Sequence, residues 1–291
     1  MRSICPRPGG CGFRWTKDLP GVTKGGPAGR ITGARLVKQA GAWHIVFRTE
    51  RQVPAPVRHS GPQVGIDRGI NLALALSDGT PREHGPWLTC GEKEHLRRLE
   101  KKSARQRAAR TPGRPTSKRL TRTYDQIAKA RATAKRRAVD WQHKTTTELA
   151  GTFGVVVVED LKITNMGRSA TGTVERPGRN VRQKAGLNRA ISGEAWGRTV
   201  TLLEYKTRDR GGLVVKVPAP GTSQTCHRCG HRDPASRDGT RFSCADPRCG
   251  WTGHADTNAA INIRNAAGTV VSGRGDLGAA RSAKRQPPRA A

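Results

Sequence analysis

The chain has 291 residues, and its 54 lysines and arginines against 22 aspartates and glutamates give a formal net charge of +32 at pH 7. The length corresponds to about two domains of ~150 residues, and the excess of positive charge predicts a polyanionic partner. No apolar run approaches the ~20 residues that span a bilayer, and no apolar stretch behind the N-terminus has the form of a signal peptide. These features exclude membrane-spanning and secreted proteins.

The N-terminal part of the sequence predicts little buried structure. Residues 1–30 are rich in glycine, proline and basic residues and lack periodicity, which indicates a loop or the start of a larger element. Two short apolar stretches, Ala34–Val37 and Trp43–Phe47, predict a β-hairpin over residues 30–50. The three prolines within residues 54–62 indicate a linker after it.

A second hairpin is predicted directly after this linker. Val64–Asp67 has the pattern of a short strand, and Ile70–Leu76 alternates large and small residues before a Ser-Asp-Gly-Thr turn. One of the few acidic residues of the chain, Asp67, therefore lies on the first strand of this hairpin.

Residues 93–148 are dominated by lysine and arginine and predict two helices. The pattern is broken once, at Thr111–Pro115, where two prolines and a glycine indicate a rigid turn. The second helix carries a stripe with the spacing of a buried face, made of Leu120, Tyr124, Ile127, Ala134, Ala138 and Trp141. The other faces are basic, which is as typical of a solvated helix surface as of a nucleic-acid contact.

The next segments alternate between predicted strands and helices. Four consecutive valines, Val155–Val158, predict a central strand covered on both faces, and Glu159 ends it. The polar, basic residues 162–189 predict a loop, and residues 192–210 predict a helix that ends at a Gly-Gly pair. Leu213–Val217 predicts the following strand.

Four of the seven cysteines have the spacing of a metal site. Cys226 and Cys229 form a C-x2-C pair, and Cys244 and Cys249 form a C-x4-C pair beyond an Asp-Gly turn. Four thiolates complete a tetrahedral zinc shell, and a closed shell indicates a structural rather than a catalytic metal. The alternative is four unrelated thiols.

Other residues near the cysteines leave further alternatives open. His227, His231 and His254 are possible substitutes for one of the cysteine ligands. Cys5 and Cys11 have the spacing of half a metal site, but we expect free thiols there.

Three of the scarce acidic residues stand at the ends of predicted elements. Asp67 lies on the first core strand, Glu159 ends the valine strand, and Asp256 begins a helix predicted over residues 254–266. Carboxylates at one end of an α/β sheet converge, and without compensating lysine or arginine they require divalent cations between them. Two Mg²⁺ ions ~3.5–4 Å apart would activate a water and stabilise the leaving oxygen of a phosphodiester. Taken singly, the acids are equally typical of a turn, a solvated strand end and a helix N-cap.

Four segments of the chain resemble, in order and spacing, the RuvC-like nuclease of the TnpB (OrfB) proteins that insertion-sequence transposons encode. They are Gly65-Ile66-Asp67-Arg68-Gly69-Ile70, Val155-Val156-Val157-Val158-Glu159-Asp160-Leu161, Thr222-Ser223-Gln224-Thr225-Cys226 and Asp256-Thr257-Asn258-Ala259-Ala260. The resemblance extends over residues 30–263. It implies Asp67, Glu159 and Asp256 as the acids that bind two catalytic Mg²⁺ ions, and Cys226, Cys229, Cys244 and Cys249 as the ligands of a structural Zn²⁺.

The fold class implied by the resemblance is α/β, with an RNase H-like (RuvC-type) mixed sheet, a helical hairpin insertion and an inserted four-cysteine zinc ribbon. We expect five parts along the chain. They are a partial wedge-like β region and linker (1–62), the nuclease core (63–221, with the helical hairpin at 92–150), the zinc ribbon (222–253), the last nuclease helix (254–266) and a disordered basic tail (267–291).

Two features depart from the family pattern. The second cysteine pair of the family is usually C-x2-C, whereas Cys244 and Cys249 are spaced C-x4-C. Family proteins also carry a complete wedge domain and a helical recognition domain before the nuclease. We expect the chain to be shortened in this region, which puts guided cleavage in doubt.

The resemblance implies a transposon-encoded, RNA-guided, Mg²⁺-dependent DNA endonuclease, with DNA and a guide RNA from the transposon end as partners, in the bacterial cytoplasm and associated with the nucleoid when bound. One alternative is a cleavage-deficient remnant or regulator that binds DNA or RNA; another is a transposase that itself joins DNA ends. The residues expected to contact nucleic acid are Arg97, Arg98, Lys101, Lys102, Arg136, Arg137, Arg179, Arg182 and Lys184.

Overall fold

The computed structural model describes residues 2–3, 13–14, 30–39, 42–50, 54–111, 113–218 and 220–272. The chain divides into two compact units, one of residues 1–55 and 85–140 and the other of residues 56–84 and 141–291. Most of the loop predicted at the N-terminus, with Cys5 and Cys11, and the tail beyond residue 272 lie outside the described residues. Among the described helices, none has the length and apolar character that crossing a bilayer requires.

The first unit contains two antiparallel strand pairs. Strands β1 (Arg2–Ser3) and β2 (Phe13–Arg14) form a short pair, and β3 (Arg30–Gln39) and β4 (Ala42–Glu50) form a long hairpin. The hairpin predicted over residues 30–50 is thus confirmed. Several of its large apolar side chains are exposed, Trp43 by 68%, and none of its described residues is fully buried.

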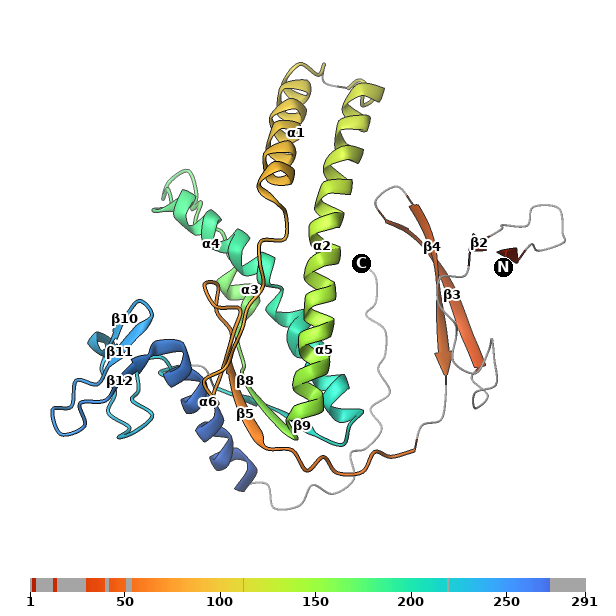
Figure 1. Ribbon diagram of the computed structural model, residues 1–291. Helices are drawn as coiled ribbons and strands as arrows, with labels where there is room; N and C mark the ends of the chain where they lie inside the picture. The colour runs from red at the N-terminus through yellow and green to blue at the C-terminus, as the bar shows by residue number, and fades with distance from the viewer. Residues whose placement is uncertain are drawn as a thin grey trace. The chain divides into compact units, whose positions relative to one another are not determined.

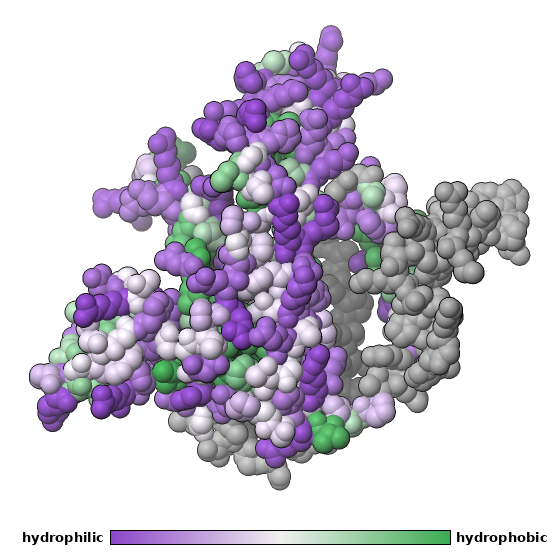
Figure 2. Space-filling view, in the orientation of Figure 1, coloured by the Kyte–Doolittle hydropathy of each residue, from purple (hydrophilic) through white to green (hydrophobic). Residues whose placement is uncertain are grey.

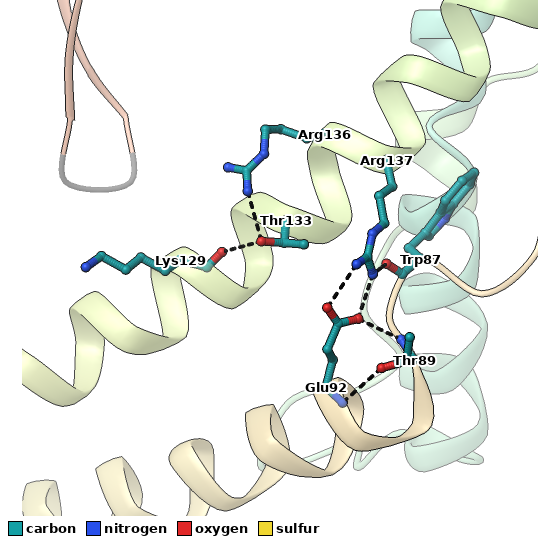
Figure 3. A network of polar contacts seen from close by, with 7 residues as sticks. All are labelled: Trp87, Thr89, Glu92, Lys129, Thr133, Arg136 and Arg137. Carbon is teal, nitrogen blue, oxygen red and sulfur yellow. Dashed lines mark hydrogen bonds and ion pairs between the residues drawn. The ribbon is translucent and has the colours of Figure 1, made fainter.

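Two helices are separated where the sequence predicts, α1 (Cys90–Ala108) and α2 (Lys118–Thr152); α1 and residues 118–140 of α2 belong to the first unit, and the rest of α2 belongs to the second. A capping box starts α1, because the Thr89 side chain accepts from the Glu92 N–H while the Glu92 carboxylate accepts from the Thr89 N–H. The same carboxylate accepts two hydrogen bonds from Arg137 of α2, at 2.6 and 2.9 Å (Figure 3). A third bond joins Arg137 to the Trp87 carbonyl, so this side chain fastens the start of α1 to α2.

The buried face of α2 differs from the predicted stripe, of which Ala134 and Trp141 are only half-buried. Leu120, Ile127 and Ala138 are buried as expected, but Tyr124 is 40% exposed. Thr123, one residue earlier, is buried in its place, because the stripe runs through the i+3 position after Leu120 rather than the i+4 position.

The second unit is built on a five-stranded mixed sheet. Its strands are β5 (Gln63–Asp67), β6 (Leu74–Leu76), β7 (Pro81–Arg82), β8 (Val155–Glu159) and β9 (Leu213–Val217), in the order β7-β6-β5-β8-β9. Strands β5, β8 and β9 are parallel, while β6 and β7 are antiparallel. Strand β6 starts later than the predicted strand from Ile70, because the chain bends first and the Gly69 carbonyl accepts a hydrogen bond from the Trp196 indole instead of a strand partner.

Helices cover both faces of this sheet (Figure 1). The C-terminal part of α2 and helix α5 (Trp196–Arg208) pack on one face, whose core is Val64, Ile66, Leu74, Leu76, Leu149, Phe153, Val156, Val158, Val200 and Leu203. Helix α6 (Ala255–Ser272) packs on the other, with Val157, Val215, Val217, Ile263 and Ala267. Since side chains alternate along a strand, Gly65 and Asp67 of β5 face α6, as do Val157 and Glu159 of β8.

Two helical predictions need correction. The segment 162–189, predicted as a loop, contains α3 (Ile163–Met166) and the first part of α4 (Val181–Glu194). Helix α4 has little apolar periodicity; Lys184 and Asn188 instead bind main-chain carbonyls at residues 166–168. The helix predicted over 192–210 is divided at Ala195, whose left-handed backbone (φ 48°) ends α4 and starts α5.

A small antiparallel sheet follows β9, made of β10 (Arg237–Asp238), β11 (Arg241–Ser243) and β12 (Thr252–His254), after a short 3₁₀ turn at Pro234–Ser236. Helix α6 then continues beyond residue 266, where the sequence predicts a disordered tail, to Ser272. The reason is packing, because Ala267 is fully buried beside Val157 and Ile263.

Candidate active site and metal centre

The four cysteines predicted to bind zinc are brought together. Their sulfur atoms all lie within 4.8 Å of one another, with Cys226 and Cys249 separated by 3.9 Å and Cys229 and Cys244 by 3.5 Å. A tetrahedral Zn²⁺ with ~2.3 Å bonds places sulfurs about 3.8 Å apart, so the donor set fits this metal. Histidines 227, 231 and 254 are not part of the group.

Each cysteine pair lies on a tight turn that ends in a left-handed glycine. Gly230 follows Cys229 with φ +78°, and Gly250 follows Cys249 with φ +55°. The longer C-x4-C spacing is accommodated by Asp246, whose carbonyl accepts from the Cys249 and Gly250 N–H groups. Both pairs therefore present their sulfurs from compact turns despite their unequal lengths.

Two asparagines of α6 hold the start of the cysteine module. The Asn258 side chain accepts from the His227 N–H at 2.9 Å and donates to the Thr225 carbonyl at 2.8 Å. Asn262 donates to the carbonyls of Thr222 and Thr225. Asn258 is fully buried, so these bonds fix the module, hereafter the cysteine ribbon (residues 222–253), against the helix that carries Asp256.

The three predicted acids also converge. Asp67 ends β5 and Glu159 ends the adjacent parallel strand β8, so both carboxylates emerge side by side on the face that α6 covers. Asp256 lies in the first turn of α6 on that same face. The alternation of buried residues in both strands explains why these two acids point towards α6 and not towards the larger core.

The pKa of Asp67 reflects the closeness of the other two acids. Burial, together with the negative charges of Glu159 and Asp256, raises the pKa of Asp67 to about 7. Burial also raises the pKa of Glu159, while a hydrogen bond from Thr222 and the charge of Arg68 oppose the rise. Two carboxylates are thus held in a site that disfavours their charge unless a cation joins them.

Basic side chains compensate part of the negative charge of these acids. Arg237 of the cysteine ribbon forms an ion pair with Asp256 at 2.7 Å and also lowers the pKa of Asp67. Arg68 is buried, with 6% of its surface exposed, and donates to the Glu159 carbonyl. Sequence reasoning missed Arg237 because its role depends on how the ribbon docks against α6.

The ribbon contributes a second contact to the acids. Thr222, its first residue, donates its hydroxyl proton to a Glu159 carboxylate oxygen at 2.5 Å. Two of the three acids are therefore oriented by side chains of the ribbon. Among the described residues, the cysteines form a group gathered tightly enough to be a metal cluster, and the three carboxylates do not.

The predicted nucleic-acid contacts differ in availability. Arg97, Arg98, Lys101 and Lys102 are exposed on α1, and Arg136 is exposed on α2, a region where Figure 2 displays mainly hydrophilic residues. Arg179 and Arg182 are exposed at the start of α4. Arg137 is instead engaged with Glu92, and Lys184 donates to the Met166 carbonyl.

Comparison with known proteins bears on the resemblance described from the sequence. Residues 46–170, which contain Asp67 and Glu159, match the family OrfB_IS605, described as "Probable transposase". Residues 196–263, which contain the four cysteines and Asp256, match "Cas12f1-like, TNB domain". The resemblance to the TnpB/OrfB family is confirmed. The two matches together contain both the acids and the cysteine ribbon.

Two curated relatives are similar to this chain over most of its length. The chain is 35% identical to "Putative RNA-guided DNA endonuclease InsQ" of Escherichia coli K12, over 95% of this chain and 64% of that protein. It is 30% identical to "Putative RNA-guided DNA endonuclease" of Streptomyces pristinaespiralis, over 91% of this chain and 58% of that protein. The chain therefore spans about three fifths of the length of these relatives.

A solved structure with similarity to this chain is the Cas12f1–sgRNA–target DNA complex. The TM-score is 0.39 at 20% identity, over 79% of this chain and 55% of that chain.

Proposed function

We propose that this chain is a transposon-encoded, RNA-guided DNA endonuclease that hydrolyses phosphodiester bonds at Asp67, Glu159 and Asp256. The observation that carries the proposal is the convergence of these carboxylates on the α6 face of the sheet, where burial and mutual repulsion raise the pKa of Asp67 to about 7. The names of the relatives, which describe RNA-guided DNA endonucleases, support the same activity.

The proposal includes the finer fold. The sheet order with β5, β8 and β9 parallel and β6 and β7 antiparallel is consistent with an RNase H-like (RuvC-type) core. The helical hairpin α1–α2 is then an insertion in that core, and the cysteine ribbon is a Zn²⁺ ribbon placed before its last helix. Zn²⁺ would be held by Cys226, Cys229, Cys244 and Cys249 and would stabilise the ribbon fold.

The carboxylates are oxygen donors of the kind that Mg²⁺ prefers. Two Mg²⁺ ions bound there would supply an activated water and neutralise the charge that develops on the leaving oxygen. Hydrolysis then forms one bond from the water oxygen to phosphorus and breaks the bond from phosphorus to the leaving oxygen, which takes up a proton. Thr222 and Arg237 act as positioning residues, because they orient the Glu159 and Asp256 carboxylates.

The remaining basic residues would bind the nucleic-acid backbone. Arg97, Arg98, Lys101, Lys102, Arg136, Arg179 and Arg182 are exposed, and phosphate contacts of this kind carry no sequence information. In the proposed function the guide RNA supplies the sequence recognition through base pairing with the DNA. DNA and a transposon-end RNA are therefore the proposed partners.

The proposal is tested with the full chain co-purified with RNA transcribed from its flanking transposon end. Asp67→Asn, Glu159→Gln and Asp256→Asn should each reduce Mg²⁺-dependent cleavage of a labelled DNA target by at least about 100-fold, because each removes a metal ligand. Their affinity for DNA, measured by fluorescence anisotropy, should stay close to that of the unmodified protein.

Asp160→Asn is the matched control. Asp160 directly follows Glu159, but its carboxylate is exposed and paired with Lys162 at 2.7 Å. This variant should cut at the original rate. Cleavage that survives Asp67→Asn, or that Asp160→Asn abolishes equally, would refute the assignment of the three acids.

A further inference from the structure

A cavity of about 240 Å³ lies in the second unit, beside the acids. It is lined by Leu72, Ala75, Thr80, Glu83, His254 and Thr257, which come from the β5–β6 connection, the β6–β7 hairpin and the junction of β12 with α6. None of these residues has a role in the proposed hydrolysis.

The register of the sheet fixes the position of this cavity relative to the acids. Ala75 of β6 is the cross-strand partner of Asp67 of β5. Its neighbours Leu74 and Leu76 belong to the core on the opposite face, so the Ala75 side chain shares the α6 face with Asp67. Glu159 flanks Asp67 on the β8 side, and the cavity therefore begins on the β6 side of the same carboxylate.

The N-terminal turn of α6 provides the second boundary. Thr257 directly follows Asp256, and His254 precedes it by two residues. The Asp256 N–H donates to His254 Nδ1 at 3.3 Å, so a neutral His254 ring carries its proton on Nε2 and can donate from there. A strand whose phosphate lies at the acids would therefore have its neighbouring nucleotide at the mouth of the cavity.

The chemistry of the lining is that of a small amphipathic ligand. Leu72 and Ala75 offer apolar surface, whereas Glu83, Thr257 and His254 offer polar groups. Glu83 is exposed at the rim of the cavity, and within the part of the chain that the structure describes its carboxylate has neither a hydrogen bond nor an ion pair. The volume of the cavity, about 240 Å³, is below the ~300 Å³ of the smallest drug-binding pockets. The cavity therefore holds a ligand no larger than about one nucleoside.

We propose that this cavity holds one unpaired nucleoside of the DNA strand, next to the phosphodiester that is cut, and that Glu83 selects bases with an amino group. The proposal rests on the proposed function, because it takes the acids as the point of cleavage. Cytosine N4–H₂ donates to a carboxylate. Uracil and thymine carry a carbonyl oxygen at the position of the cytosine amino group, and this oxygen repels a carboxylate.

Cytosine and uracil make the sharpest comparison, because they differ in the amino group and the neighbouring ring nitrogen but not in size. A set of single-stranded DNA substrates carries one deoxycytidine at successive positions in a deoxyuridine background. The full chain with its RNA should cut at a fixed distance from the deoxycytidine, about tenfold more than elsewhere, as expected for one hydrogen bond to a charged group. Glu83→Gln should reduce this preference to less than about twofold, because its amide also donates to the uracil carbonyl.

Asp209→Asn is the control, since Asp209 is an exposed carboxylate outside the cavity and its loss changes the net charge equally. It should keep the tenfold preference. Equal cutting at every position by the unmodified protein, or an unaltered preference in Glu83→Gln, would overturn the subsite while leaving the endonuclease proposal intact.

A binding measurement separates the subsite from the cleavage chemistry. The affinities for deoxycytidine and deoxyuridine dodecamers are compared without added divalent metal, so that no strand is cut. The ratio should favour deoxycytidine in the unmodified protein and approach one in Glu83→Gln. If this ratio depends on Glu83 while no DNA is cut with Mg²⁺, the proposed function and the position next to a cut phosphodiester fail, whereas base selection by Glu83 stands. A ratio that is the same in both proteins contradicts base selection by Glu83.

Discussion

Arg237 links the cysteine ribbon to the acids at the level of single side chains. Its guanidinium contacts Asp256 at 2.7 Å, and the Asp256 side chain is only 12% exposed. An arginine in this position serves two purposes, because it compensates part of the negative charge around Asp67 and fixes the Asp256 carboxylate in one orientation.

Replacing Arg237 tests this positioning role. Arg237→Ala should lower cleavage about 10- to 100-fold at a fixed Mg²⁺ concentration, the usual cost of losing a residue that orients a metal ligand. The measurement is the cleavage rate as a function of Mg²⁺, whose midpoint should move to a higher concentration. Arg241→Ala, an exposed arginine of the same ribbon, should leave the curve in place; an equal change in both variants would mean a general loss of DNA binding.

Sequence reasoning reaches the acids but not the residues that orient them. Asp67, Glu159 and Asp256 stand out because acids are scarce and these three end or begin periodic segments. Thr222 and Arg237 carry no such signal, since each belongs to a polar segment with many similar residues. Their importance arises from the docking of the ribbon on α6, which depends on Asn258 and Asn262.

At the level of elements, the crossing of α6 over β5 sets the distance between Asp67 and Asp256. Gly65 allows it, because a Cβ there would collide with the Ala260 carbonyl and lie 2.6 Å from the Arg264 nitrogen. The helix therefore packs directly on the backbone of the strand that carries Asp67.

Gly65→Ala should lower the free energy of unfolding by about 1–3 kcal/mol, because α6 must move away from β5. Urea denaturation followed by circular dichroism measures the change. Gly151→Ala in α2, where an added Cβ meets nothing within 4 Å, is the control and should stabilise the protein by about 0.5–1 kcal/mol. Equal stabilities for Gly65→Ala and the unmodified protein would contradict this packing.

The cysteine ribbon should contain one metal ion. Elemental analysis of the purified chain should find about one zinc per molecule, and the double variant Cys226→Ser, Cys229→Ser should lose it together with the ribbon fold. Cys90→Ser changes an exposed cysteine outside the ribbon and should retain the metal. Zinc content that is unchanged in the double variant would rule out this site.

Neighbouring arginines of α2 should have different roles. Arg137→Ala should lower Tm, because it removes the pair with Glu92. Arg136→Ala should leave Tm unchanged and reduce the salt dependence of DNA affinity by about 0.7–0.9 in the log–log slope. The hydrogen bonds that Arg137 donates to the Glu92 carboxylate lower the pKa of Glu92 to about 2, below its ordinary value. The Arg137 contribution to stability is therefore complete above pH ~4.5 and is lost as the pH falls towards 2.

Thermal melts at pH 7 and pH 2.5, together with anisotropy titrations at several salt concentrations, separate these roles. A lower Tm for Arg136→Ala, or a Tm difference for Arg137→Ala that does not shrink at low pH, would contradict the assignment.

Elements with clear periodicity are predictable from this sequence, and those held by polar contacts are not. The valine strand β8 and the hairpin β3–β4 follow from apolar patterns. Helix α4 does not, because hydrogen bonds from Lys184 and Asn188 to the main chain replace an apolar face. The division between α4 and α5 at Ala195 requires a left-handed alanine, which no local signal predicts.

At the scale of the whole molecule, the features that would bind and cut nucleic acid lie in different parts of the chain. The helical hairpin of the first unit is rich in exposed arginine and lysine, whereas the second unit holds the acids and the cysteine ribbon. The net charge of +32 is predictable from composition, and it supports a nucleic-acid partner. It does not distinguish a nuclease from a protein that only binds; in the proposed function, the three acids make that distinction.

Guided cleavage in living cells tests the central claim most directly. The chain is co-expressed with its flanking transposon RNA and challenged with a plasmid library randomised beside the guide-matched target. The account predicts that plasmids with one short motif are depleted, and that Asp67→Asn abolishes the depletion while Asp160→Asn preserves it. If no motif is depleted from the library by the unmodified protein, or if Asp67→Asn depletes the same motif equally, the account is contradicted.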